Sequence, residues 1–151
     1  MKVKLVTAVL ALALGAIALP AAAQVKPETL VKQRQSAMTL IGKYWGPLGA
    51  MAQGKAPYNA DTVARNAGFL AALVQMPWDG FDASTKDVKS AALPAIWSDA
   101  AKFKSAQENA QKAIAALAAA TKGGNEATVK AALGDVGKTC GGCHNDFRQK
   151  Q

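Results

Sequence analysis

Apolar residues recur at helical spacing in the first long stretch after residue 24. Pro27 and Glu28 suit a first helical turn, where proline is tolerated and the helix dipole favours an acidic side chain. The sequence from Gly54 to Pro57 is typical of a helix stop. The pattern therefore predicts a first helix between these signals, with inward positions at steps of three, four or seven: Leu30, Ala37, Ile41, Trp45, Leu48 and Ala52.

Three more helices follow from the same reasoning. Asn59 can cap a second helix that Pro77 ends, a third runs from about Pro94 to Thr121, and Asn125 can cap a fourth. Alternating runs of β-branched residues are absent, so no strand is expected. Short connections predict an all-α, antiparallel four-helix bundle. Its inward positions include Val63, Ala67, Leu70 and Val74 in the second helix and Phe103, Ala110, Ile114 and Leu117 in the third.

The segment between Pro77 and Pro94 is the least regular part of the chain. A long loop in a small domain usually has a function of its own or is loose. Trp78 and Phe81 indicate that this one folds back onto the bundle.

Residues 1–23 have the pattern of a cleaved secretory signal. Lys2 and Lys4 precede an apolar run, Pro20 breaks it, and three alanines offer a cleavage site before Gln24. The uncharged run is long enough that a retained membrane anchor is the alternative. We expect cleavage, which leaves a domain at 24–151 in the periplasm of a bacterium, with no membrane segment after cleavage.

Composition changes this picture in two ways. The interior is rich in alanine, which buries little area, so the core would be thin and leave room for something other than side chains. The formal charge of +8 comes from lysines and arginines scattered along every helix, so a nucleic-acid groove is not expected. A residual positive field would favour an acidic electron-transfer partner.

Both cysteines and the only histidine lie together in Cys140-Gly141-Gly142-Cys143-His144. This spacing is the attachment signature of c-type haem, in which two thiols add to the vinyl groups and the imidazole binds iron. The cysteines continue an inward helical stripe, so both thiols are expected to face the core. The members of that stripe are Val129, Leu133, Val136, Cys140, Cys143 and Phe147.

Three other interpretations of the motif compete. A thioredoxin-type redox disulfide needs a βαβ context, and no strand is predicted. A zinc site would have three ligands in five residues and no fourth. A structural disulfide loop would leave His144 without a role. Covalent attachment of one haem c per chain is therefore favoured.

The sequence resembles the cytochrome c′ family, the class II c-type cytochromes. The resemblance covers essentially all of residues 24–151 and implies a periplasmic four-helix bundle, commonly a homodimer through its first two helices. It also implies a five-coordinate, high-spin iron that binds nitric oxide and carbon monoxide, with roles in nitric oxide binding or detoxification, or in electron transfer with a periplasmic partner that the sequence does not name. No catalytic residue is expected. The stretches that carry the resemblance are residues 34–37, 55–58, Pro77-Trp78 with Phe81, 96–99, 134–137 and 140–148.

The resemblance assigns roles to individual residues. Cys140 and Cys143 become the thioether donors and His144 the axial iron ligand. Arg148 would lie beside the proximal imidazole, the alternative being a solvated base at the helix end. Arg34 and Gln35 match a pair that contacts the haem propionates, the alternative being an ordinary exposed helix pair.

Met38 is the main ambiguity, because its position faces the distal iron site in the family. Related low-spin class II cytochromes use a methionine here as sixth ligand, whereas an apolar gap-filler is the usual role of methionine. We favour a five-coordinate iron with Met38 crowding the distal face. Trp78 and Phe81 match aromatics that pack near the haem, or else anchor the loop. No haem contact is assigned within residues 82–93.

Overall fold

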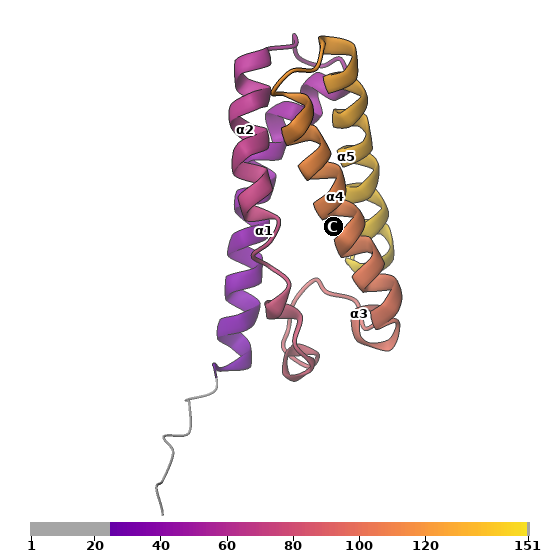
Figure 1. The fold of residues 1–151 in the computed structure, drawn as a ribbon. Helices are drawn as coiled ribbons and strands as arrows, with labels where there is room; N and C mark the ends of the chain where they lie inside the picture. Colours follow the sequence, from indigo (N-terminus) through magenta and orange to yellow (C-terminus); the bar gives the residue numbers. More distant parts are fainter. Residues whose placement is uncertain (1–24, 151) are drawn as a thin grey trace, which may run out of the picture.

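The computed structural model describes residues 25–150, so the predicted signal segment lies outside the described residues. Four long helices form an up-down-up-down bundle: α1 (Pro27–Ala52), α2 (Ala60–Leu73), α4 (Ala100–Ala120) and α5 (Glu126–Phe147) (Figure 1). No strand occurs in the described part of the chain, apart from one isolated backbone bridge. The predicted all-α four-helix bundle is confirmed.

Side-chain caps fix where the helices begin. Asn59 accepts a hydrogen bond from the Thr62 amide at 2.8 Å, and Asn125 accepts one from the Thr128 amide at 2.9 Å. Both caps confirm the prediction from sequence. Each occupies one of the amide donors that a helix start leaves without an intrahelical partner.

The predicted third helix is interrupted. A short helix α3 (Ala95–Ser98) precedes α4, and the backbone at Asp99 departs from helical geometry with φ −126° and ψ 58°. The Asp99 carboxylate then caps α4 by accepting from the Lys102 amide at 3.2 Å. This cap could not be predicted from the sequence, because apolar periodicity continues across the break.

One end of the bundle is closely packed. Nine buried residues from all four long helices meet there, and we call this region the packed end. Burying each large aliphatic side chain of this kind contributes roughly 1.5–3 kcal/mol. These residues are Leu48, Val63, Ala67, Leu70, Ile114, Leu117, Val129, Leu133 and Val136.

The opposite end, which we call the cavity end, contains residues 27–41, 100–110 and 139–147 together with the segment that links α2 to α3. That segment includes two short 3-10 helices, η1 (Asp79–Phe81) and η2 (Ala83–Thr85), and folds back against α1. Phe103 is the centre of an aromatic cluster, with ring centroids 6.0 Å from Trp78, 5.0 Å from Phe81 and 5.2 Å from Phe147. The expected return of this loop onto the bundle is confirmed.

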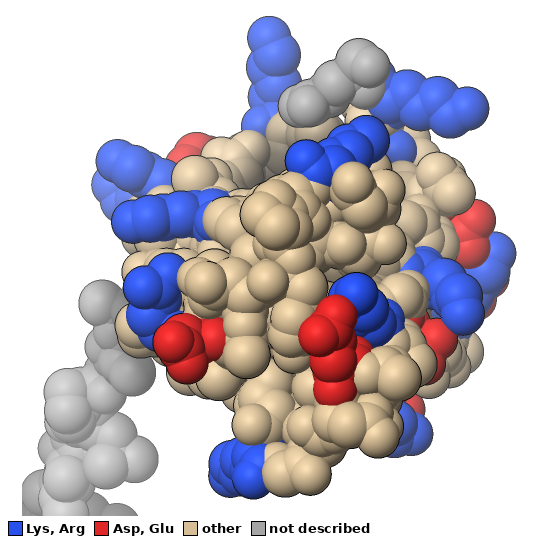
Figure 2. Space-filling view, turned by 90° about the horizontal axis from the view of Figure 1, so that it is seen from above, with Lys and Arg blue, Asp and Glu red and all other residues tan. Residues whose placement is uncertain are grey.

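Charge is distributed without a single-sign groove on the face that Figure 2 shows, where acidic side chains stand among the lysines and arginines. Exposed ion pairs such as Lys138–Asp135, at 2.9 Å, join opposite charges along the helices. Within residues 25–150, no helix is long and apolar enough to cross a bilayer.

Candidate functional site

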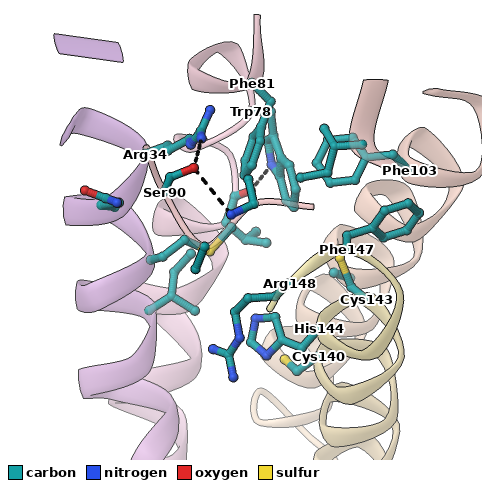
Figure 3. A pocket seen from close by; sticks show the side chains of 18 of the residues that line it. Arg34, Trp78, Phe81, Ser90, Phe103, Cys140, Cys143, His144, Phe147 and Arg148 are labelled. Atoms are coloured by element: carbon teal, nitrogen blue, oxygen red, sulfur yellow. Dashed lines mark hydrogen bonds between the residues drawn. The ribbon is translucent and has the colours of Figure 1, made fainter. Parts of the chain in front are cut away.

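A cavity of about 510 Å³ opens between α1, α4, α5 and the segment that follows α2. Its size falls in the range of sites that hold a cofactor or small molecule. Figure 3 shows side chains from these elements converging on it. All nine predicted site residues line it: Arg34, Gln35, Met38, Trp78, Phe81, Cys140, Cys143, His144 and Arg148.

Helix α5 supplies the chemistry of one wall. Val136 and Phe147 are buried, and the half-buried Cys140 and Cys143 lie between them on the same face, as the predicted stripe requires. Both thiols are free, and they reach the cavity where the close packing of the stripe ends. The motif therefore presents two thiols, one helical turn apart, to the same space.

Desolvation shifts the pKa values of the titratable groups on this wall. Desolvation raises the pKa of the Cys140 thiol, and desolvation with the nearby Cys140 and Asp146 raises that of Cys143. Desolvation lowers the pKa of His144, and the positive charge of Arg148 lowers it further. At neutral pH the wall therefore presents protonated thiols and a neutral imidazole, the form that binds a metal.

Arg34 is the most deeply buried charged group of the cavity, with 3% of its surface exposed. One guanidinium nitrogen donates to the Gly80 carbonyl and to Thr85 Oγ1 at 2.9 Å, and the other donates to Ser90 Oγ at 3.0 Å. The guanidinium also lies over the Phe81 ring, 4.5 Å from its centroid. Burial lowers the pKa of Arg34, but a guanidinium stays charged.

These contacts bear on the alternative that Arg34 and Gln35 form an ordinary exposed helix pair. An ordinary exposed helix pair describes Gln35, which is exposed, but is wrong for Arg34. The reason is that the segment after α2 lies over Arg34 and uses its donors, a tertiary contact that helix periodicity does not encode.

The sequence assigns no haem contact within residues 82–93, and the structure adds that Ser90, Ala91 and Ala92 line the cavity. These three side chains are small and lie in an irregular segment, so no sequence pattern indicated that they would line the cavity. The backbone brings them there, since Arg34 holds Ser90 while Leu93 and Ala91 pair with the end of α5.

The rest of the lining is predominantly apolar. Phe103 and Ile114 were expected only as core positions, yet both line the cavity, as does Ile96. Such a wall accepts a flat apolar ring, while the polar side chains of Arg34 and Ser90 in the lining suit carboxylate groups. The residues present therefore fit a haem c, which Cys140 and Cys143 on α5 would hold covalently. The apolar side chains are Met38, Ile41, Val74, Trp78, Phe81, Ile96, Phe103, Ala110, Ile114 and Phe147.

A helical bundle whose last helix presents two thiols and an imidazole to an apolar cavity defines a c-type haem protein. Comparison with known proteins makes this specific, because the Cytochrome C′ family model matches residues 29–148. The cytochrome c′ of Rubrivivax gelatinosus is 44% identical over 126 residues, which cover 83% of this chain and 98% of that protein. The chain belongs to the cytochrome c′ family.

Solved structures agree with this assignment. The crystal structure of cytochrome c′ from Rubrivivax gelatinosus aligns with a TM-score of 0.76 at 42% identity, covering 82% of this chain and 98% of that one. Cytochrome c prime from Shewanella frigidimarina aligns with a TM-score of 0.79 at 35% identity, covering 84% and 99%. A nitric oxide complex of a variant from Alcaligenes xylosoxidans aligns with a TM-score of 0.75 at 41% identity, covering 85% and 99%.

Family membership confirms the cofactor. It is haem c, attached covalently through cysteines, and Cys140 and Cys143 are the two cysteines of the sequence. The disulfide and zinc interpretations of the motif are therefore set aside.

Proposed function

We propose that this protein is a high-spin haem protein that binds nitric oxide and carbon monoxide at a five-coordinate iron, with His144 as its one protein ligand. One observation carries the proposal: a single cavity has the attachment motif on its α5 wall and apolar side chains around the rest. When bound, haem c supplies an iron whose open position takes a diatomic gas. A role in nitric oxide binding or detoxification, or in electron transfer, follows from that chemistry.

His144 provides a neutral imidazole at the start of the last turn of α5. The lowered pKa favours the unprotonated nitrogen that iron requires, and the other ring nitrogen would donate to water or a carbonyl. Arg148 contributes to that shift through its charge, which supports its placement beside the proximal imidazole.

Arg34 and Gln35 would hold the haem propionates. No carboxylate forms a salt bridge with Arg34 within residues 25–150, so its buried charge has no protein counter-ion there. A buried cation without an anion is costly, and a propionate would supply the missing charge. The exposed Gln35, next in sequence and also lining the cavity, adds a neutral donor.

The apolar lining of the cavity favours nitric oxide and carbon monoxide over oxygen. Bound oxygen is stabilised by a nearby hydrogen-bond donor, whereas nitric oxide and carbon monoxide bind iron without one. Met38, Trp78 and Phe81 supply no strong donor to the cavity, since the Trp78 indole N–H donates to the Val74 carbonyl. The sequence has no second histidine to act as a donor.

A visible spectrum of the reduced holoprotein tests the proposal. We expect a high-spin, five-coordinate spectrum that changes when nitric oxide or carbon monoxide is added. A sharp six-coordinate, low-spin spectrum that neither gas alters would overturn it.

The second candidate is a low-spin electron carrier with Met38 as sixth iron ligand. The observation in its favour is that Met38 and His144 line the same cavity. Methionine ligation would raise the reduction potential and close the gas site. Met38→Leu separates the two: an unchanged spectrum excludes this candidate, while conversion from low to high spin supports it. Met51→Leu is the control, because Met51 packs against the core of the packed end.

Export and self-association complete the proposal. Cleavage after residue 23 would deliver the domain to the periplasm, which the mass of the protein isolated from that compartment checks. Leu40 and Phe69 are large apolar residues with 43% and 45% exposure, and Phe69 stacks on Tyr44 with centroids 4.7 Å apart. This face of α1 and α2 supports a homodimer, and Phe69→Glu should yield a monomer in sedimentation experiments.

A further inference from the structure

The last turn of α5 carries His144, yet it lacks the usual means of ending a helix. Helices commonly finish with a glycine in the left-handed conformation, whereas here Arg148 follows with extended geometry at φ −126° and ψ 137°. The last carbonyls of a helix have no intrahelical donors and must find partners elsewhere. The ends of helices also fray when those partners are missing.

The missing partner comes from a distant part of the chain. The Leu93 amide donates to the Phe147 carbonyl at 3.0 Å, and the Gln149 amide donates to the Ala91 carbonyl at 2.8 Å. These two bonds form an antiparallel bridge between Ala92 and Arg148. Pro94 favours this arrangement, because the residue before a proline is biased toward extended backbone.

The other side of this segment is fastened to α1. Ser90 Oγ accepts from the Arg34 guanidinium at 3.0 Å and from the Ala92 amide at 3.3 Å, so the hydroxyl joins the arginine to the bridge (Figure 3). Arg34 is fixed in turn by Gly80 and Thr85. The backbone of residues 90–93 and its hydrogen bonds therefore link α1, along one wall of the cavity, to the last turn of α5.

We propose that residues 90–93 form a strap that caps the haem-bearing helix α5 from outside, and that Ser90 is a positioning residue for His144. The strap pairs with Arg148, and the Arg148 amide donates to the His144 carbonyl at 3.2 Å. The strap therefore holds the residue that closes the last helical turn at His144. Loss of the Ser90 hydroxyl would leave the Ala92 amide and one guanidinium nitrogen of Arg34 without their acceptor. The last turn would then fray, and the imidazole would be held less firmly.

The inference rests on the proposed role of His144 as iron ligand, so the experiment reads the strap and the iron separately. Amide hydrogen exchange of Leu93 and Gln149 in the reduced holoprotein reports the strap, and the iron–histidine stretching band in the resonance Raman spectrum reports His144. In Ser90→Ala we expect both amides to exchange about three- to tenfold faster, as loss of one hydrogen bond allows, and the band to shift or broaden. Ser90→Thr, which keeps the hydroxyl, should restore both signals.

Ser84→Ala is the matched control, because Ser84 is an exposed serine of the same segment outside this chain of bonds. It should leave both signals unchanged. Unchanged exchange in Ser90→Ala overturns the strap, and faster exchange with an unchanged iron–histidine band overturns the link to His144. If Ser90→Ala does not accumulate, Ser90→Cys provides the same test, since a thiol is close in size to the hydroxyl and only a weak hydrogen-bond acceptor. A low-spin spectrum would overturn the proposed gas-binding function and leave the exchange result interpretable.

Discussion

At the packed end, the long helices meet through fully buried leucines and valines, whereas at the cavity end the same helices leave a space of about 510 Å³. Helix α5 belongs to both regions. Its stripe is buried as far as Val136, then continues as Cys140 and Cys143, which are only half-buried. One uninterrupted helical pattern therefore builds a core over half its length and a cofactor site over the other half.

The two ends also differ in what closes them. Side chains alone fill the packed end, and its caps are local, as with Asn125 and Thr128. The cavity end is closed by residues far apart in sequence, with Arg34 reaching Ser90 and Leu93 reaching Phe147. The difference indicates that the packed end supplies stability without the cofactor, while the cavity end needs its long-range contacts and haem.

Removing both thiols should have the largest effect of the changes considered, and the effect should be confined mainly to the cavity end. In Cys140→Ser with Cys143→Ser, haem is no longer held covalently, and the apolar walls around the cavity lose the group that fills it. Amide exchange should accelerate at least about tenfold around residues 30–41 and 139–147, and much less in the packed end. Intact mass and exchange measured by mass spectrometry check this prediction. Asn145→Ala, an exposed change on the same helix, should keep the added mass of one covalent haem and leave the exchange pattern unchanged.

Truncating a core side chain at the packed end should lower the free energy of unfolding and leave the haem site unchanged. Leu133 is fully buried, and Leu133→Ala leaves a hole that closely packed neighbours fill only in part, at a cost of about 2–5 kcal/mol in the free energy of unfolding. Denaturant unfolding measures the loss. The spectrum of the reduced haem should stay as in the unchanged protein, and a spectral change would show that the two ends are not independent.

The packed end could be predicted from sequence almost in full. Periodicity identified buried positions such as Leu70, Leu117 and Leu133, and Asn59 and Asn125 marked the helix starts. These features are local, because a helix repeats every 3.6 residues and a cap reaches only three residues along the chain. The one helix start that escaped prediction, at Asp99, lies at the cavity end, where its cap interrupts the helix without interrupting the apolar pattern.

At the cavity end, only the haem-attachment chemistry could be predicted from the sequence. The motif from Cys140 to His144 is compact and specific, so the attachment site followed from the sequence. The burial of Arg34 and the contribution of Ser90 did not, because both depend on an irregular segment crossing from α1 to α5. The contacts of Arg34 with this segment join residues 46 to 56 positions apart and leave no periodic pattern in the sequence.

Gly80 tests how tightly that segment is held. A Cβ built on Gly80 would lie 2.7 Å from Arg34 Cβ and 2.8 Å from the Leu30 carbonyl oxygen, so Gly80→Ala must push η1 away from α1. We expect a loss of about 1–3 kcal/mol in unfolding free energy and faster exchange of the Leu93 amide. Gly134→Ala is the control, because no heavy atom lies within 4 Å of its Cβ, and alanine in a helix should stabilise by about 0.5–1 kcal/mol. Equal effects of the two substitutions would contradict the close approach at Gly80.

The smallest expected effect comes from removing the N-cap of α5. The two ends of this helix are closed by different means, so they can be tested separately. Asn125 accepts from the Thr128 amide, and Asn125→Ala should cost about 1 kcal/mol, the usual value of a helix N-cap. The loss should appear in denaturant unfolding and in exchange of the Thr128 and Val129 amides, while the haem spectrum and the Leu93 amide stay unchanged. Ser90→Ala should give the opposite pattern, because the strap acts on the last turn. If removing the N-cap instead altered the haem spectrum, α5 would respond as one rigid rod, and the separation between the packed end and the cavity end would fail.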